Sequence, residues 1–117
     1  MVFADVFPEF IRALPQPDAT LPASMQARLI GSDDALAMFY SIPDGATVPE
    51  HAHGAQWGVV IAGSFDLVIG GEPTTYTAGD TYSVDAGVPH TAILHPGYVG
   101  IDVFADADRY GQRPSTA

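Results

Sequence analysis

The chain has 117 residues, enough for one domain with a hydrophobic core but too few for two. It carries 14 acidic residues against 4 arginines, and a formal net charge of −10 argues against binding to nucleic acid or to an anionic membrane surface. It has no cysteine for disulfides or thiolate chemistry, no signal-peptide pattern at its start and no run long enough to span a membrane, so we expect a cytoplasmic protein.

The first predicted element is a short amphipathic helix near the N-terminus. Pro8 suits a first helical turn, and Pro15 ends the helix. We expect the helix to pack on the outside of a barrel or on a second subunit. Its apolar positions at helical spacing are Phe7, Phe10, Ile11 and Leu14.

From residue 25 onward the pattern is one of short strands and turns. Valines, aromatic residues and alternating polarity favour pleated, half-buried surfaces, and Gly70-Gly71 is a strong hairpin signal. Many short strands at regular spacing, separated by glycine and proline, predict an all-β sandwich or barrel. The predicted strands cover residues 25–30, 35–42, 47–53, 56–61, 64–69, 74–77, 81–84, 91–94 and 98–104.

Two short motifs contain three of the four histidines. His51 and His53 are two positions apart, so their side chains share one face of a strand. Gln56 would face away in a straight strand, so residues 54–55 must bend or bulge to bring it round. His90 follows a turn that Gly87 would set. Three imidazoles and one amide oxygen suit a divalent transition metal, whereas a His-x-His pair alone is more often an exposed polar pair.

These residues resemble the two sequence motifs of the cupin superfamily, with glutamine where the first motif usually has glutamate. The resemblance implies a single cupin domain, a double-stranded β-helix or jelly-roll barrel over residues 23–108, with a helix and connector over 1–22 and a tail over 109–117. It also implies one divalent ion, which could be zinc, nickel, iron or manganese. The matching motif residues are Gly45, His51, His53 and Gly63, then Gly79, Asp80, Gly87 and His90; the implied metal ligands are His51, His53, Gln56 and His90.

The strand predicted over residues 98–104 is the second informative stretch. Asp102 and Phe104 share one face, and Ile101 and Val103 share the other. If the first pair faces the interior, Asp102 stands near the metal, where it could act as a general base. If the second pair forms the core, Asp102 faces solvent. The residues alone leave both orientations open.

The late Asp-x-Phe and the arginine after it add a narrower resemblance. Together with the histidines and Gln56, they are similar to the small cupins of pectin and alginate catabolism, which open the ring of 4,5-unsaturated uronates. That resemblance implies catalytic roles for Asp102, Phe104 and Arg109, the last displaced by one residue.

Three functions fit these observations. The first is a metal-dependent lyase, isomerase or hydrolase acting on a small oxygen-rich anion, with uronate ring opening as the leading instance. The second is a metal-dependent dioxygenase, although facial-triad iron oxygenases use a carboxylate ligand that this set lacks. The third is a cupin that binds a metal or a small molecule without turnover. We expect an anionic small-molecule substrate, no nucleic-acid or membrane partner, and a homodimer that covers apolar strand faces.

Four further residues lie outside these motifs. His95 is expected to be a solvated surface residue, and Trp57 a core or subunit contact whose side chain points opposite to that of Gln56. Tyr40 and Tyr82 could line the cavity or merely satisfy a strand preference, and the sequence does not decide between these.

Overall fold

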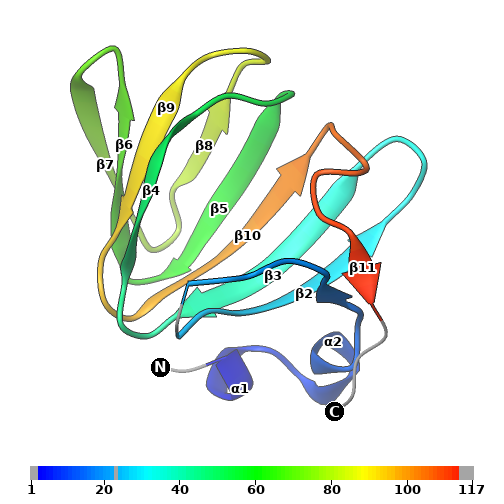
Figure 1. Cartoon of the computed structure of the whole chain (residues 1–117). Coiled ribbons are helices and arrows are strands. Elements are labelled where there is room, and N and C mark those ends of the chain that lie inside the picture. The colour runs from blue at the N-terminus through cyan, green and yellow to red at the C-terminus, as the bar shows by residue number, and fades with distance from the viewer. Residues whose placement is uncertain (1–2, 23, 114–117) are drawn as a thin grey trace.

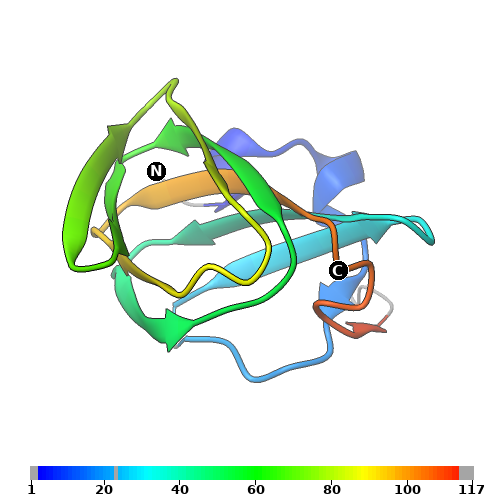
Figure 2. The same cartoon turned by 90° about the horizontal axis from the view of Figure 1, so that it is seen from above.

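Two antiparallel sheets make up most of the molecule, and the computed structural model describes residues 3–22 and 24–113 (Figure 1). The five-stranded sheet has the order β2-β3-β10-β5-β8, and the four-stranded sheet has the order β4-β9-β6-β7. The strands are β2 (Gln26–Gly31), β3 (Leu36–Ile42), β4 (Ala46–His51), β5 (Gln56–Ala62), β6 (Ser64–Ile69), β7 (Glu72–Thr77), β8 (Thr81–Val84), β9 (His90–Leu94) and β10 (Tyr98–Phe104). Seen from above, the two sheets surround a common interior (Figure 2).

This architecture confirms the all-β prediction, and the turn residues explain much of it. Gly70 and Gly71 join β6 to β7 with φ angles of 59° and 79°, a left-handed conformation that residues with a Cβ atom rarely adopt. The inward positions of both sheets fill the interior with a main apolar core. Its most buried members include Leu29, Leu36, Ile42, Val60 and Tyr98.

One predicted strand is shorter than expected. β4 ends at His51, whereas we predicted a strand to His53. Its register against β9 shifts between Val48 and His51, and Pro49 in that interval has no N–H to donate to the ladder. His53 therefore lies in the connection between β4 and β5 rather than on a strand.

The N-terminal segment forms two small helices, α1 (Phe3–Val6) and α2 (Glu9–Arg12), and α2 is the short helix that was predicted to begin near Pro8. Pro8 separates them in an extended conformation, with φ −68° and ψ 165°. Phe3 and Phe7 are buried with Val99 in a second apolar cluster, so this segment covers the outer face of the five-stranded sheet. Phe10, by contrast, is 76% exposed.

A small additional sheet joins the two ends of the described chain. β1 (Gln16–Pro17) pairs antiparallel with β11 (Gln112–Arg113). Residues 1–2 of the predicted N-terminal segment, residue 23 at the start of the predicted barrel and residues 114–117 of the predicted tail lie outside the described residues. Within the described ranges, none of the helices has the length and apolar character needed to cross a membrane.

Candidate metal centre

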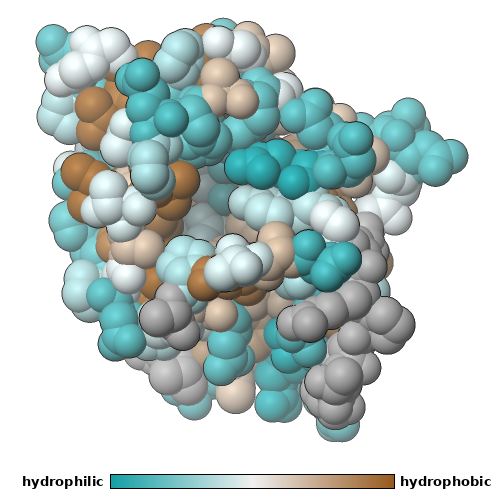
Figure 3. All heavy atoms as spheres, in the orientation of Figure 1, coloured by the Kyte–Doolittle hydropathy of each residue, from teal (hydrophilic) through white to brown (hydrophobic). Residues whose placement is uncertain are grey.

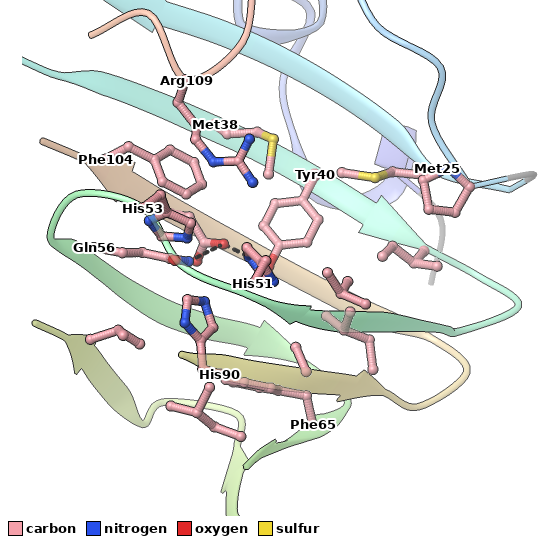
Figure 4. A pocket seen from close by; sticks show the side chains of 18 of the residues that line it. Met25, Met38, Tyr40, His51, His53, Gln56, Phe65, His90, Phe104 and Arg109 are labelled. Carbon is pink, nitrogen blue, oxygen red and sulfur yellow. Dashed lines mark hydrogen bonds between the residues drawn. The ribbon is translucent and has the colours of Figure 1, made fainter. Parts of the chain in front are cut away.

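Three histidines meet where the two sheets open at one end of the barrel. His51 ends β4 and His90 begins β9, and the two are cross-strand partners; His53 reaches in from the connection after β4. Their ring centroids are 4.3 to 5.1 Å apart. One ligand atom of each lies within 4.8 Å of those of the other two, so the group could hold a metal ion (Figure 4).

Backbone contacts select one tautomer for all three rings. In each ring Nδ1 lies 2.7 to 2.9 Å from a backbone carbonyl oxygen. A carbonyl oxygen can only accept, so Nδ1 carries the proton and Nε2 keeps a free lone pair. Such a second hydrogen bond orients a histidine ligand toward a metal. The three imidazoles are therefore suited to bind a metal ion. The three acceptors are the carbonyls of Pro49, Gly54 and Val88.

The loop that carries His53 is held from two sides. The N–H of Gly87 donates to the carbonyl of His53 at 2.8 Å, and the N–H of Gly54 donates to Asp106 Oδ2 at 2.7 Å. A Cβ atom on Gly54 would lie 2.3 Å from Asp106 Oδ1, so any larger residue there would require the Asp106 carboxylate to move. Asp106 was not predicted to serve the site. The glycine between His53 and Gln56 was the only sign in the sequence that another side chain approaches closely.

Gln56 comes from the opposite sheet. It begins β5, and the chain bends at Gly54 in the connection between the two sheets, so of the two predicted alternatives the bend, rather than a bulge, brings Gln56 to the histidines. Its amide Nε2 donates to Asp102 Oδ2 at 3.1 Å. A carboxylate only accepts hydrogen bonds, so the amide NH2 group of Gln56 faces Asp102. Oε1 of Gln56 is then the atom available to a cation.

Asp102 faces the interior, which decides the orientation that the sequence left open. It is 4% exposed and accepts hydrogen bonds from Tyr40 at 2.9 Å, from Tyr82 and from Gln56. Burial raises the pKa of Asp102 to about 6, against the opposing effect of its three donors. Tyr40 and Tyr82 therefore both line the cavity, and burial raises the pKa of each well above its usual value.

A glycine makes this hydrogen-bonded cluster possible. Asp102 on β10 and Tyr82 on β8 both pair with Gly58 on the strand between them. A Cβ atom at Gly58 would lie 2.3 Å from Asp102 Oδ1 and 2.4 Å from the Tyr82 hydroxyl. The two side chains meet across β5 because that position has no side chain.

Phe104 and Arg109 lie beside the histidines. Phe104 is 3% exposed, and its ring meets that of His53 edge-on at 5.7 Å. The Arg109 guanidinium carbon lies 4.6 Å from the ring centroid of Tyr110 and 5.7 Å from that of Phe104. Arg109 Nε is buried and has no hydrogen-bond partner among the described residues. Figure 4 shows this side chain directed into the same cavity as the histidines.

The electrostatic environment of His51 favours its neutral form. Burial lowers the pKa of His51, and the charges of His90, His53 and Arg109 lower it further, although the hydrogen bond to Pro49 acts in the opposite direction. A neutral ring is the form that binds a metal, so His51 is suited to do so to a lower pH than a solvated histidine.

The histidines open into a cavity of about 240 Å³ between the sheets, and the surface is hollowed in the space-filling view (Figure 3). The cavity brings together the seven residues predicted to be metal ligands or catalytic groups, and their roles remain predictions. They are His51, His53, Gln56, His90, Asp102, Phe104 and Arg109.

Two other residues lie away from this cavity. His95 is on the surface, and its Nε2 lies 3.1 Å from Asp66 Oδ2. Trp57 lies on the outer side of β5 and is 46% exposed, so it is not a core residue.

The sequence model of the cupin domain family matches residues 38–96, half of the chain. The chain belongs to the cupin family. Its two sheets and the place of its motifs agree with that membership, and the predicted cupin fold is confirmed. A comparison with curated proteins found no significant match.

Similar solved structures include KdgF from Halomonas sp., at 25% identity over 75% of this chain and 84% of that one, with a TM-score of 0.66. An RmlC-like cupin from Shewanella frigidimarina is 24% identical over 89% of this chain and 93% of that one, with a TM-score of 0.72. An oxalate decarboxylase variant from Bacillus subtilis is 23% identical over 79% of this chain and 28% of that one, with a TM-score of 0.66. The last two are similar in fold alone.

Proposed function

We propose that this cupin is a metal-dependent lyase, isomerase or hydrolase acting on a small oxygen-rich anion. The observation that carries the proposal is the convergence of three imidazoles, each with a free Nε2, on a cavity that also contains Arg109 and a buried carboxyl group. Cavities that combine convergent polar groups with a strongly shifted pKa are candidate active sites.

One divalent transition ion would be held by His51, His53, Gln56 and His90. Zinc, nickel, iron and manganese all accept such nitrogen and oxygen donors. Because all four ligands are neutral, the ion would keep its full charge and would supply Lewis-acid activation of a carboxylate or carbonyl oxygen.

The remaining groups have roles that follow from their positions. Arg109 Nε is buried and finds no hydrogen-bond partner in the described part of the chain, which suits this guanidinium to bind the substrate anion. Phe104 covers the ring of His53 and helps to exclude water. Asp102, with a pKa raised to about 6, can hold a proton or release it near neutral pH, so we propose it as the general acid or base.

The first substrate to test is a 4,5-unsaturated uronate, the class that the sequence resemblance names. We expect its conversion to stop when a chelator removes the metal and to recover when a single divalent metal is restored. Conversion that persists after the metal content has fallen to zero would overturn the proposal. Oxygen consumption by the iron-loaded protein would favour the dioxygenase instead.

We also propose a homodimer, and the cytoplasmic location stays a prediction from sequence. Exposed apolar side chains remain on the outer side of the five-stranded sheet and on α2. Buried in a dimer, they would be removed from water. Light scattering at micromolar concentration tests this, and a monomer there would refute it. The side chains are Phe10, 76% exposed, Ile30, 50%, Trp57, 46%, and Ile61, 37%.

A further inference from the structure

The cavity is polar at one end and apolar along the rest of its length. On β9 the inward positions are His90, Ala92 and Leu94, which line the cavity in succession. At about 3.4 Å per residue, Leu94 lies about 14 Å along the strand from His90. Moving away from the histidines, the lining therefore changes from imidazole to aliphatic on a single strand.

The neighbouring strands continue the apolar part. Phe65 and Leu67 line it from β6 and Ile42 lines it from β3, all three buried. Met25 and Met38 close it on another side, and their unbranched side chains adapt to the shape of an apolar partner (Figure 4).

Few polar groups remain for a ligand in that part. The hydroxyls of Tyr40 and Tyr82 already donate to Asp102. Apart from these two, the hydroxyl side chains among the described lining residues are those of Tyr110, Thr20 and Thr47. Tyr110 packs against Phe104 and Arg109 at the histidine end, and Thr20 and Thr47 are exposed to solvent at the rim.

This lining discriminates between two kinds of acid. Each methylene moved from water into an apolar site strengthens binding by about fourfold. A ligand hydroxyl buried there without a partner weakens binding by about tenfold. The cavity therefore favours an aliphatic body over a polyhydroxylated one, and its volume of about 240 Å³ limits the ligand to a small molecule.

We infer that the natural ligand is a small amphipathic acid. Its carboxylate and a second oxygen lie at the histidines and Arg109, and an aliphatic body extends toward Ala92 and Leu94. The inference rests on the proposed function, since it assumes that the histidine end binds an oxygen-rich anion. It narrows the expected natural ligand away from sugar acids with a full set of hydroxyls. A 4,5-unsaturated uronate therefore remains the first compound to assay for turnover, but it should bind more weakly than an aliphatic 2-hydroxy acid of the same carbon number.

The test uses the full chain loaded with zinc and measures binding by titration calorimetry. The probes are lactate, 2-hydroxybutanoate, 2-hydroxypentanoate and 2-hydroxyhexanoate, which share one head group and differ in length. We expect affinity to rise by about fourfold with each added methylene. D-gluconate, with the same carbon number as 2-hydroxyhexanoate but hydroxylated along its length, should bind at least about 100-fold more weakly than that acid.

A matched pair of variants locates the tail. Ala92→Leu places extra volume inside the cavity. It should reduce the gain in affinity with each added methylene, while the affinities for zinc and lactate stay the same. Thr91→Leu adds bulk at the neighbouring position, which does not line the cavity, and should leave the series as steep as in the unmodified chain. The series measured on the unmodified chain tests the inference even if Ala92→Leu does not fold.

The outcomes separate the two proposals. If affinity does not rise with chain length, or if gluconate binds as tightly as 2-hydroxyhexanoate, the inference of an amphipathic ligand is wrong. The proposed function is unaffected by either result. Failure of zinc, nickel, iron and manganese all to bind, or lactate affinity that is the same with and without the bound metal, overturns the proposed function itself.

Discussion

Two regions of the molecule combine histidine with aspartate, yet they differ in what the imidazoles contact. In the cavity His51, His53 and His90 each use Nδ1 on a backbone carbonyl, so Nε2 stays free. On the outer surface, Nε2 of His95 is already paired with Asp66 at 3.1 Å. The comparison teaches that histidines alone do not make a metal site. Backbone carbonyls that accept from Nδ1 leave each Nε2 with a lone pair available to a metal.

The aspartates of the two regions differ in the direction of their pKa shifts. Both accept hydrogen bonds from hydroxyl groups, Asp102 from two tyrosines and Asp66 from Thr75. Burial raises the pKa of Asp102 to about 6, whereas the hydrogen bond from Thr75 lowers the pKa of Asp66. Similar partners thus give opposite shifts because one carboxyl group is buried and the other is solvated.

The largest expected effect separates the histidines. His53→Ala should weaken zinc binding by about 10²–10³-fold, since one of four ligands accounts for roughly a quarter of an about 10–16 kcal/mol interaction. His95→Ala, the matched control, should leave zinc affinity unchanged. Competition with a chromogenic chelator measures both. Equal losses in the two variants would refute the assignment of the cavity histidines.

The next prediction concerns stability and pH in the metal-free protein. A carboxyl group with a raised pKa contributes stability below its ordinary pKa and loses it as the pH rises through the folded value. For Asp102, whose pKa is raised to about 6, this loss is about 3 kcal/mol between about pH 4 and pH 7. Asp102→Asn should remove that part of the pH dependence in urea unfolding.

Asp66→Asn provides the opposite sign. The pKa of Asp66 is lowered, so its contribution is present above its ordinary pKa and is lost as the pH falls. We take the free energy of unfolding of the unmodified chain minus that of each variant and plot this difference against pH. The slopes for Asp102→Asn and Asp66→Asn should therefore have opposite signs. Slopes of the same sign would mean that burial does not determine the pKa of Asp102.

Asp102→Asn should also reduce turnover of the true substrate by about 10²-fold. The amide is nearly isosteric and cannot exchange a proton, so zinc content should stay the same. Asp66→Asn should leave turnover intact. Steady-state kinetics with metal analysis of each preparation measures this, and full activity of Asp102→Asn would remove its proposed role.

The smallest expected effect tests the space behind Asp102. Gly58→Ala introduces a Cβ atom 2.3 Å from Asp102 Oδ1 and should destabilise the protein by about 1–3 kcal/mol through overpacking. Gly70→Ala meets no atom within 4 Å and should cost only about 1 kcal/mol, from its φ of 59°. Equal costs in denaturant unfolding would show that contact at Gly58 is unimportant.

The strands and the candidate ligands could be predicted from the sequence because their signals are local. Alternating polarity and the Gly70-Gly71 turn fix β6 and β7, and the resemblance to cupin motifs fixes the four candidate ligands. The short helix predicted at Pro8 is present as α2, which begins directly after that proline, whereas the separate helix α1 was not predicted.

Contacts between distant strands could not be predicted in this way. Strand alternation states that Asp102 and Phe104 share a face, but not which face is inside. That choice depends on Tyr40, Tyr82 and Gly58, which lie on three other strands. Likewise, Asp106 supports the His53 loop from 52 residues away, a contact that no local pattern encodes.

The most direct test of the metal centre is anomalous diffraction at the zinc edge from crystals of the zinc-loaded protein. We predict one peak about 2.0–2.2 Å from Nε2 of His51, His53 and His90 and from Oε1 of Gln56. A peak between His95 and Asp66 with none at the three cavity histidines, or coordination through Nδ1, would contradict the account.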